Sequence, residues 1–329
     1  MILSLLIVEI FLRVFYPFPL SGSWRVQDKN GLLLNKNYIS TKHEYILDSK
    51  TIRAYYKFGE FNNRIYKSLN YEQSKPKILV LGDSFTFGWL LNDEDTFVQK
   101  LSNKYKNLSF INSSAGGWGT SDFLSYIENY CEKISPNITY VFMNNTDHER
   151  ALNSKLYFLD EKNKLNKGYN LINKNKKKLN NIVFYDFMIE NSHLLQLFRS
   201  VLNIRNSDNQ KNMRKKTDDN LDYSKNLFMI KEIYKKMKIE TKKCGSILKL
   251  VNLNWPLDVS NNFFKKMNKD IYDFLEISNF EYVSLKNEMN EIKNNLKFYE
   301  IPIDKHPNNH ANKYIFDVLV KKKLFINKF

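Results

Sequence analysis

Ser84 is the residue whose type and setting first suggest chemistry. It follows the short apolar run Ile78 to Leu81 and stands in the sequence Gly82-Asp83-Ser84. Such a run is typical of a buried parallel strand, and a strand, a sharp turn and a helix together lift a serine out of the carboxyl edge of a sheet. Ser84 would then be a nucleophile near backbone N–H groups that favour negative charge. Asp and Ser also form ordinary turns, so the motif needs partners elsewhere.

A base for this serine is predicted near the carboxyl end, in Asp304-Lys305-His306. Residues two apart in an extended segment point to the same side. Asp304 can therefore accept a hydrogen bond from one nitrogen of His306, which fixes the tautomer and leaves the other nitrogen free to take a proton. Ser84, Asp304 and His306 make a candidate triad for acyl transfer.

Two further strand ends offer hydrogen-bond donors for an oxyanion. Residues 112–120 read Asn-Ser-Ser-Ala-Gly-Gly-Trp-Gly-Thr, and three glycines in four residues permit backbone N–H groups to face a bound anion. Residues 144–150 read Asn-Asn-Thr-Asp-His-Glu-Arg, in which an Asn amide is another donor. The alternatives are an ordinary Gly-rich turn for the first stretch and helix capping for the second.

The other histidines are weaker candidates. His148 is a rival base, but it stands next to the predicted amide donor rather than opposite Ser84. His310 lies four residues after His306, a spacing that suits a metal on a helix face, yet Pro307 disfavours a helix through both. We therefore predict no metal and no cofactor. Two histidines have no carboxylate at a useful spacing: His43 and His193.

The elements that must hold these side chains alternate along the chain. Strands are predicted at residues 78–81, 108–112, 138–143, 247–253 and 281–285. Helices are predicted from residue 97 onward and at 121–134, 223–242, 262–275 and 309–319. Five strands separated by helices predict an α/β fold, with a five-stranded parallel sheet between two helical layers. Chemistry in such sheets gathers at the carboxyl ends of the strands, where each candidate above falls.

Three regions lie outside this alternation. Residues 1–20 are strongly apolar, with Glu9 and Arg13 as their only charges, and we predict a hydrophobic N-terminal anchor; an amphipathic helix docked on the domain is the alternative. Residues 21–75 contain short β-like runs and are predicted to form an extended or β-rich collar. Residues 76–329 form the predicted main domain, with a Lys/Asn-rich insertion at about 151–221. That insertion has a hairpin-like part, a helix around 194–202 and a partly mobile stretch near 206–220.

Composition bounds the class of protein. The 329 residues are 43% hydrophobic and 15% aromatic, which favours a globular chain over a disordered one. The net charge of +16 comes with scattered Lys and abundant Asn, and no nucleic-acid motif is present, so we predict no nucleic-acid partner. Cys131 and Cys244 fit no metal spacing, and the sequence leaves open whether they form a disulfide.

With these residues in view, the chain resembles the SGNH/GDSL hydrolase superfamily, and more narrowly its membrane-anchored bacterial envelope members. Residues 82–84 resemble the first block, which carries the nucleophile Ser84, and residues 112–120 resemble the second, whose oxyanion glycine best matches Gly117. Asp304 and His306 resemble the final block. The resemblance covers about residues 76–150 and 244–320, and it implies a flavodoxin-like three-layer fold. The apolar amino end and the collar with Trp24 also resemble that subgroup.

Two departures from the family pattern stand out. The third block is usually Gly-x-Asn-Asp, whereas residues 143–147 read Met-Asn-Asn-Thr-Asp. Counting from the strand favours Asn145 as the oxyanion donor, with Asn144 as the alternative. The last block is most often Asp-x-x-His, whereas this chain has Asp304-x-His306. That shorter spacing resembles the SGNH-like polysaccharide O-acetyltransferases and many anchored members.

The resemblance implies a serine esterase with Ser84, Asp304 and His306 as catalytic residues. Ser84, Gly117 and Asn145 would form the oxyanion hole. The expected substrate is an ester. The resemblance favours an O-acetyl ester on an envelope carbohydrate or on a similar small molecule. The expected location is the extracytoplasmic or periplasmic face of a membrane. The alternatives are an O-acetyltransferase with the same triad and a catalytically silent envelope scaffold or glycan-binding protein. Trp89 and Trp118 are candidates for stacking on a sugar, with core packing as the alternative.

Overall fold

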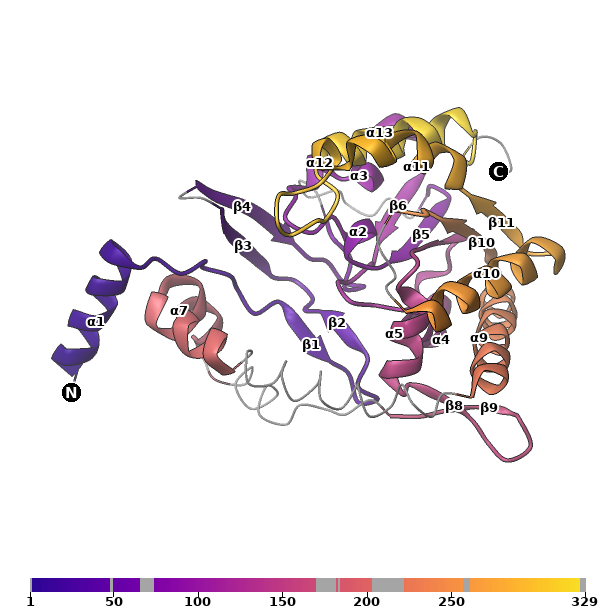
Figure 1. Cartoon of the computed structure of the whole chain (residues 1–329), viewed down its shortest axis with the longest axis horizontal. Helices are drawn as coiled ribbons and strands as arrows, with labels where there is room; N and C mark the ends of the chain where they lie inside the picture. Colours follow the sequence, from indigo (N-terminus) through magenta and orange to yellow (C-terminus); the bar gives the residue numbers. More distant parts are fainter. Residues whose placement is uncertain are drawn as a thin grey trace.

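A parallel five-stranded sheet forms the centre of the protein (Figure 1). The computed structural model describes residues 2–47, 50–65, 74–169, 182, 184–202, 222–256 and 261–325. The sheet order is β11-β10-β7-β5-β6, and every neighbouring pair is parallel. Its strands are β5 (Lys77–Gly82), β6 (Ser109–Asn112), β7 (Ile138–Met143), β10 (Ile247–Asn252) and β11 (Glu281–Ser284). The predicted α/β fold with five parallel strands is confirmed.

Helices cover both faces of the sheet, as the continuous burial of β5 from Ile78 to Gly82 requires. Leu79 and Leu81 pack in one core cluster with residues of α4 (Thr120–Ile134), α9 (Tyr223–Lys243) and α10 (Asn262–Ile277). Ile78 and Val80 pack in a second cluster with α3 (Phe97–Lys104), α11 (Lys286–Ile292) and α13 (Asn309–Lys321). Successive side chains of a strand point to opposite faces, so one apolar run serves both layers.

The chain before β5 forms a helix and two hairpins. Helix α1 (Ile2–Phe15) leads to β1 (Arg25–Gln27) and β2 (Leu33–Asn35), which pair antiparallel. Strands β3 (Ser40–Leu47) and β4 (Lys50–Lys57) form the second hairpin. A small aromatic cluster of Trp24, Tyr56 and Phe58 with Phe87 joins these hairpins to the loop after β5. Within the described residues, no helix is both long and apolar enough to cross a membrane.

Short elements lie after β5, β7 and β11 and in the described part of the predicted insertion. They are α2 (Ser84–Phe87), η1 (Asp93–Asp95), α5 (Asp147–Ser154), β8 (Tyr157–Leu159), β9 (Leu165–Lys167), α7 (Tyr185–Asn191), η2 (Lys293–Asn295) and α12 (Leu296–Tyr299). Residues 193–202 are helical as well. The hairpin β8–β9 and the helix near 194–202 match the sequence-based expectation. The stretch near 206–220, predicted to be mobile, lies outside the described residues.

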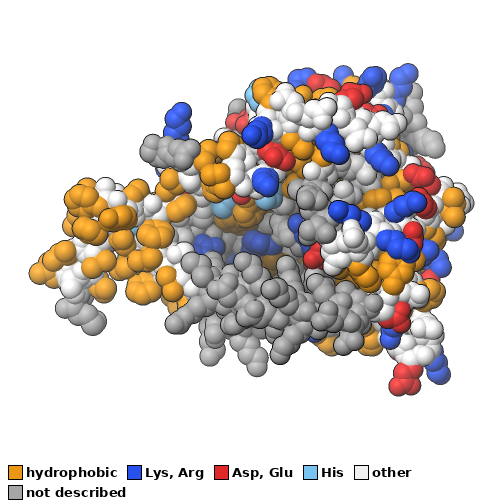
Figure 2. All heavy atoms as spheres, viewed as in Figure 1, with side chains coloured by type: hydrophobic (Ala, Val, Ile, Leu, Met, Phe, Trp, Pro, Cys, Tyr) orange, Lys and Arg blue, Asp and Glu red, His pale blue; other side chains and the backbone are white. Residues whose placement is uncertain are grey.

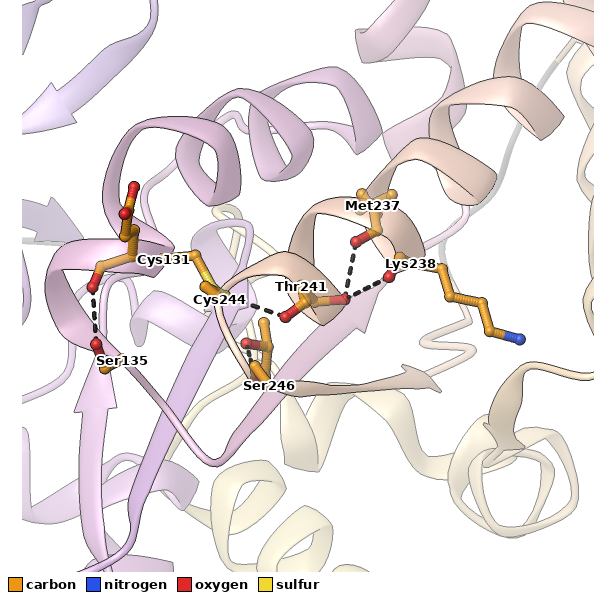
Figure 3. The surroundings of a disulfide bond; sticks show 9 residues. Cys131, Ser135, Met237, Lys238, Thr241, Cys244 and Ser246 are labelled. Carbon is orange, nitrogen blue, oxygen red and sulfur yellow. Dashed lines mark hydrogen bonds between the residues drawn. A yellow bond between two sulfur atoms is a disulfide. The ribbon is translucent and has the colours of Figure 1, made fainter.

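A disulfide joins the carboxyl ends of two helices that pack side by side. Cys131, in the last turn of α4, is bonded to Cys244, which caps α9, and their Cα atoms are 5.9 Å apart (Figure 3). The pairing that the sequence left open is therefore present. The bond closes a loop over a sequence separation of 113 residues.

Removing this cross-link is expected to destabilise the fold. Closing so long a loop restricts the unfolded chain, and a bond of this kind stabilises by roughly 2–5 kcal/mol. Denaturant titration should therefore show a lower free energy of unfolding for the Cys131→Ser/Cys244→Ser double variant than for the oxidised parent. A reductant should lower the stability of the parent to the same level and leave the double variant unchanged. Equal stability of parent and variant would contradict the prediction.

Candidate active site

Ser84 lies directly after the central strand, at the start of a single helical turn. Asp83 is the N-cap of α2, and its carboxylate accepts from the Phe85 N–H at 2.9 Å. Gly88 ends the turn in the left-handed region at φ 80°, where glycine meets no steric penalty. A Cβ on Gly82 would lie only 2.5 Å from Thr86 Cβ, so this strand-to-turn junction has room for glycine alone. As the first residue of the helix, Ser84 has a backbone N–H with no acceptor inside it.

Arg64 holds the carbonyls of this loop. Its Nη1 donates to the carbonyls of Phe87 at 2.6 Å and Gly88 at 2.9 Å, and its Nη2 donates to that of Leu91 at 2.9 Å. Its Nε donates to Asp93 at 2.7 Å. The guanidinium is almost fully buried, and all of these bonds are charge-assisted. The loop that carries Ser84 is therefore held by a collar residue as well as by the sheet.

The loop before α13 brings His306 and Asp304 to Ser84. His306 Nε2 lies 2.8 Å from Ser84 Oγ, and His306 Nδ1 lies 2.5 Å from Asp304 Oδ1. A backbone bond from the Ile301 N–H to the His306 carbonyl, at 2.8 Å, closes this loop. Burial alone would raise the pKa of Asp304, but its hydrogen bond with His306 and the charge of that ring hold the pKa below its usual value. An ionised carboxylate only accepts, so Nδ1 carries the proton and Nε2 faces the serine hydroxyl as acceptor.

Aromatic rings surround the imidazole of His306. The rings of Phe85 and Trp89 lie 5.3 and 5.7 Å from it, centroid to centroid. Behind Trp89, at 4.5 Å, lies His43 of strand β3, and burial lowers its pKa to about 4. His43 is therefore uncharged at neutral pH and packs as an aromatic ring. Trp118, by contrast, is fully buried and donates to the Leu33 carbonyl, which removes it as a sugar-stacking candidate.

The glycine loop after β6 packs against Ser84. A Cβ on Gly116 would lie 3.8 Å from Ser84 Cβ and 3.3 Å from the Trp89 ring. Gly117 has φ 79°, and the nearest atom to its virtual Cβ is Arg25 Nη2, at 3.6 Å. Arg25, at the start of β1, donates to the Gly116 carbonyl. The collar thus holds the loop that the sequence predicts to bind the oxyanion.

Arg25 is a site residue that sequence reasoning missed. Its Nε is buried and has no hydrogen-bond partner among the described residues. Burial lowers the pKa of the guanidinium to about 10, against the opposing charge of Asp122. It remains charged at neutral pH, and it places a positive charge beside Gly116 and Gly117. No motif around residue 25 marks it, because only the folded path of the collar brings it there.

Arg25→Met is expected to lower kcat for hydrolysis of a neutral acetyl ester by up to about 10²-fold. The reason is that the Gly116 carbonyl loses its donor, and shifts of about 1 Å in a positioning loop have effects of that size. Arg53→Met is the matched control, because Arg53 lies on β4 and pairs with Glu44. A kcat for Arg25→Met that equals that of Arg53→Met would show that Arg25 does not position the loop.

A cluster of charged side chains around Arg150 packs against the loop that carries Ser84. Arg150 Nη1 donates to Asp83 at 2.9 Å and to Asp147 at 3.4 Å. Burial and the neighbouring Asp83 raise the pKa of Asp147 well above its usual value. Burial also raises the pKa of Asp122 to about 7, although the Gly119 N–H donates to its carboxylate. Asp83, Asp122 and Asp147 therefore all interact electrostatically with Arg150. Because they follow β5, β6 and β7, they link the segments at these three strand ends.

The two asparagines after β7 have different contacts. Asn144 is fully buried, and its Nδ2 donates to Asp83 Oδ1 at 3.1 Å. Asn145 accepts from the Tyr272 hydroxyl at 3.1 Å, and it lines a cavity of about 380 Å³ beside α10. The contacts of Asn145 thus tie it to α10, whereas Asn144 touches the loop that carries Ser84. The oxyanion role of Asn145 stays a prediction.

Alanine variants of the two asparagines test these assignments. We expect Asn144→Ala to lower kcat at least about tenfold, because Asp83 loses a partner beside the nucleophile and shifts the loop. For Asn145→Ala, an oxyanion donor predicts a fall in kcat of about 10²–10³-fold with little change in KM. Steady-state kinetics on one acetyl ester measures both. An unchanged kcat for Asn145→Ala would reject the role predicted from its position after the strand.

The remaining histidines have other partners. His148, the rival base, is buried, with Nδ1 at 2.6 Å from Asn268 Oδ1 and Nε2 at 2.9 Å from the Tyr234 hydroxyl. Burial lowers the pKa of its ring to about 4. His310 lies against the Phe298 ring at 4.3 Å. Over the described ranges, no group of three or more His, Cys, Asp or Glu side chains could hold a metal ion.

Comparison with known proteins gives fold-level likenesses only. No family model matches the chain, and no curated protein matches it. Among solved structures, it is similar to TesA, with a TM-score of 0.43 and 10% identity over 74% of this chain and 96% of that one. It is also similar to the psychrotrophic esterase EstA from Pseudoalteromonas sp., with a TM-score of 0.43 and 15% identity over 77% and 100%. A third is a catalytic mutant of Axe2, an acetylxylan esterase from Geobacillus stearothermophilus, with a TM-score of 0.42 and 12% identity over 75% and 93%. These low scores carry no argument about the activity of this chain.

Proposed function

We propose that the protein is a serine ester hydrolase of the SGNH/GDSL type. The observation that carries the proposal is the line of three side chains in which Ser84 Oγ, His306 and Asp304 are joined by contacts of 2.8 and 2.5 Å. This is the order of groups that activates a hydroxyl as nucleophile. Three further features support it: the sheet-edge turn at Ser84, the glycine loop that faces it and the aromatic wall around the imidazole.

The chemistry follows from this order. Ser84 Oγ attacks the carbonyl carbon of the ester while its proton passes to His306 Nε2. The tetrahedral intermediate collapses as His306 returns that proton to the leaving alcohol, and the acyl group stays on Ser84. Water then attacks the acyl-enzyme by the same route, with His306 again taking and returning the proton. Asp304 stays ionised throughout and stabilises the charged imidazole.

The negative oxygen of both intermediates needs donors at this edge of the sheet. We assign the backbone N–H groups of Ser84 and Gly117 and the amide of Asn145 to this oxyanion hole. Ser84 N–H begins a helix, and Gly117 lies in the loop that packs against the nucleophile. Loss of one such donor typically lowers turnover by about 10²–10³-fold.

For the substrate, we propose an acetyl ester on an envelope carbohydrate. Trp89 supports a sugar, because its ring lies beside His306 and remains partly exposed. We further propose that the protein is held at the extracytoplasmic face of a membrane by its amino-terminal segment. The disulfide between Cys131 and Cys244 supports an oxidising compartment, and α1 supports a lipid contact because its apolar side chains are exposed.

A fluorophosphonate probe tests the reaction class directly. The probe should label the folded protein at one site, and peptide mass spectrometry should place the label on Ser84. Ser84→Ala should give no labelling at equal thermal stability. A folded parent that is not labelled would reject the hydrolase and favour a silent scaffold. A panel of acetylated glycans and small acetyl esters, with free acetate as the readout, then tests the substrate class.

A further inference from the structure

An extensive apolar surface lies at the amino-terminal end of the molecule, away from the active site. Its exposed side chains on α1 are Leu3, Leu5, Leu6, Ile7, Val8, Ile10, Phe11, Val14 and Phe15. Those on the neighbouring helices, with the N-cap residue of α7, are Phe184, Phe187, Met188, Phe198, Val201 and Leu202. We call these two sets the apolar platform. Figure 2 shows hydrophobic side chains gathered at this end of the molecule, over the region where Figure 1 places α1 beside α7.

Glu9 joins the two sets of the platform by hydrogen bonds between α1 and residues 192–194. Its carboxylate accepts from the N–H groups of His193 at 3.0 Å and Leu194 at 2.9 Å, and from the Ser192 hydroxyl at 2.9 Å. It thus caps the helical residues 193–202 from outside their own segment. Burial would raise the pKa of Glu9, but these bonds and the one from Arg13 outweigh it and lower the pKa to about 2. The one acidic residue of α1 therefore faces the neighbouring helices rather than solvent.

The pattern of exposure favours lipid over a protein partner. Four consecutive residues of α1, from Leu5 to Val8, are between 41% and 59% exposed, and together they cover a full turn. A protein groove covers one stripe of a helix, whereas lipid covers every side. Arg13 pairs with Glu9 and donates to the Asn191 carbonyl at 2.5 Å, so the basic group of α1 also lies toward its neighbour. The chain carries a net charge of +16, which favours anionic lipid head groups.

We propose that residues 184–202 are a membrane-docking element, and that α1 and these helices enter the same phospholipid surface as one platform. This gives part of the predicted insertion a role. It goes beyond the proposed hydrolase function and does not depend on the chemistry of Ser84. In this arrangement Phe187 and Phe198 dip into the interfacial region beside α1.

The platform is also hydrogen-bonded to the start of the collar, whose strands pack near the active site. Gln196 Nε2 donates to the Ser21 carbonyl at 2.7 Å, and Arg199 Nη1 donates to the carbonyls of Ser21 at 2.8 Å and Gly22 at 3.2 Å. Two residues after Gly22, the segment that leads into β1 carries Trp24, whose ring packs 6.0 Å from that of Trp89. Docking of the platform therefore constrains the orientation of the collar relative to the bilayer. Through the collar it also constrains the orientation of the catalytic edge.

Site-specific fluorescence on vesicles tests the proposal with the full chain. Single variants Phe187→Cys, Phe198→Cys and Ile7→Cys are labelled with an environment-sensitive dye, which spares Cys131 and Cys244 because the disulfide occupies them. The matched control is Ile277→Cys, because Ile277 is 84% exposed at the end of α10, far from α1 in Figure 1. Each protein is added to phosphatidylcholine vesicles with and without phosphatidylglycerol, and the vesicles carry a nitroxide lipid as quencher.

We expect the emission at positions 7, 187 and 198 to shift to shorter wavelength and to be strongly quenched, more so with phosphatidylglycerol. The dye at position 277 should keep its aqueous emission. Glu9→Leu removes the hydrogen bonds between α1 and residues 192–194. Quenching at positions 187 and 198 should then fall, while quenching at position 7 persists. Quenching at 7 alone in the parent would overturn the proposal, since residues 184–202 would then lie off the membrane. A blue shift at 187 that depends on protein concentration without lipid would also overturn it, in favour of self-association. Probe labelling of Ser84 in the same samples reports separately on the hydrolase.

Discussion

Ser84→Ala is expected to lower kcat for ester hydrolysis by about 10⁵–10⁶-fold, the scale of effect seen when the nucleophile of a hydrolase triad is removed. In the proposed mechanism, the hydroxyl that lies 2.8 Å from His306 Nε2 forms the bond to the acyl carbon, and a methyl group cannot. Hydrolysis of a chromogenic acetyl ester, followed at saturating substrate, measures the change. The backbone donors remain in place, so a small residual rate above the uncatalysed reaction is expected.

A second serine provides the control for this variant. Ser102 lies on α3, outside the triad, and Ser102→Ala should keep the parental kcat. The variant at position 84 removes a single hydroxyl from a nearly buried residue, so its melting temperature should stay close to that of the parent. Turnover by Ser84→Ala within a few-fold of the parent would mean that another group does the chemistry, and the proposed mechanism would be wrong.

Asp304→Asn should lower kcat by about 10⁴-fold while the local geometry persists. The carboxylate accepts from His306 Nδ1 at 2.5 Å, whereas an amide can present its NH₂ to that nitrogen. The imidazole then carries its proton on Nε2 and no longer accepts from Ser84. The charge that stabilises the imidazolium is lost in the same step. Steady-state kinetics should show the fall in kcat with little change in KM.

Asp317→Asn is the matched control, because Asp317 lies on the neighbouring helix α13 and, among the described residues, pairs with exposed Lys313. It should retain parental activity. The double variant Asp304→Asn/Ser84→Ala should be no slower than Ser84→Ala alone, since the carboxylate acts through a serine that is no longer present. A loss of less than tenfold for Asp304→Asn would show that Asp304 does not govern the tautomer of His306.

The parts of the site that sequence reasoning found are those with a local signature. The apolar run before Gly82 predicts a strand, and the abrupt change to Asp83 and Ser84 predicts a turn at its end. Asp304 and His306 lie two apart, so their pairing follows from backbone geometry alone. The five strands were predicted within a residue or two for the same reason, since each is a short apolar or β-branched run between helices.

The parts that it missed depend on where distant segments meet. Arg25 and His43 belong to the collar strands β1 and β3, and nothing near them in the sequence marks the glycine loop or Trp89 as their neighbours. The disulfide could be predicted only by knowing that α4 and α9 end side by side. In the sequence, Glu9 is an isolated charge in an apolar segment. The structure shows that its carboxylate accepts three hydrogen bonds from residues 192–194. Local periodicity carries no information about such tertiary contacts.

The sequence separation between Ser84 and His306, 222 residues, sets an order of events during synthesis. A ribosome delivers the amino-terminal part first, so the strand, the turn and the hydroxyl can fold well before the imidazole is made. Until the segment before α13 emerges and closes, the serine is an ordinary alcohol with no proton acceptor. Under the proposed mechanism, a chain that stops before residue 304 therefore lacks the groups that would activate Ser84. In that mechanism, the site is completed only when His306, 222 residues after Ser84, has been synthesised.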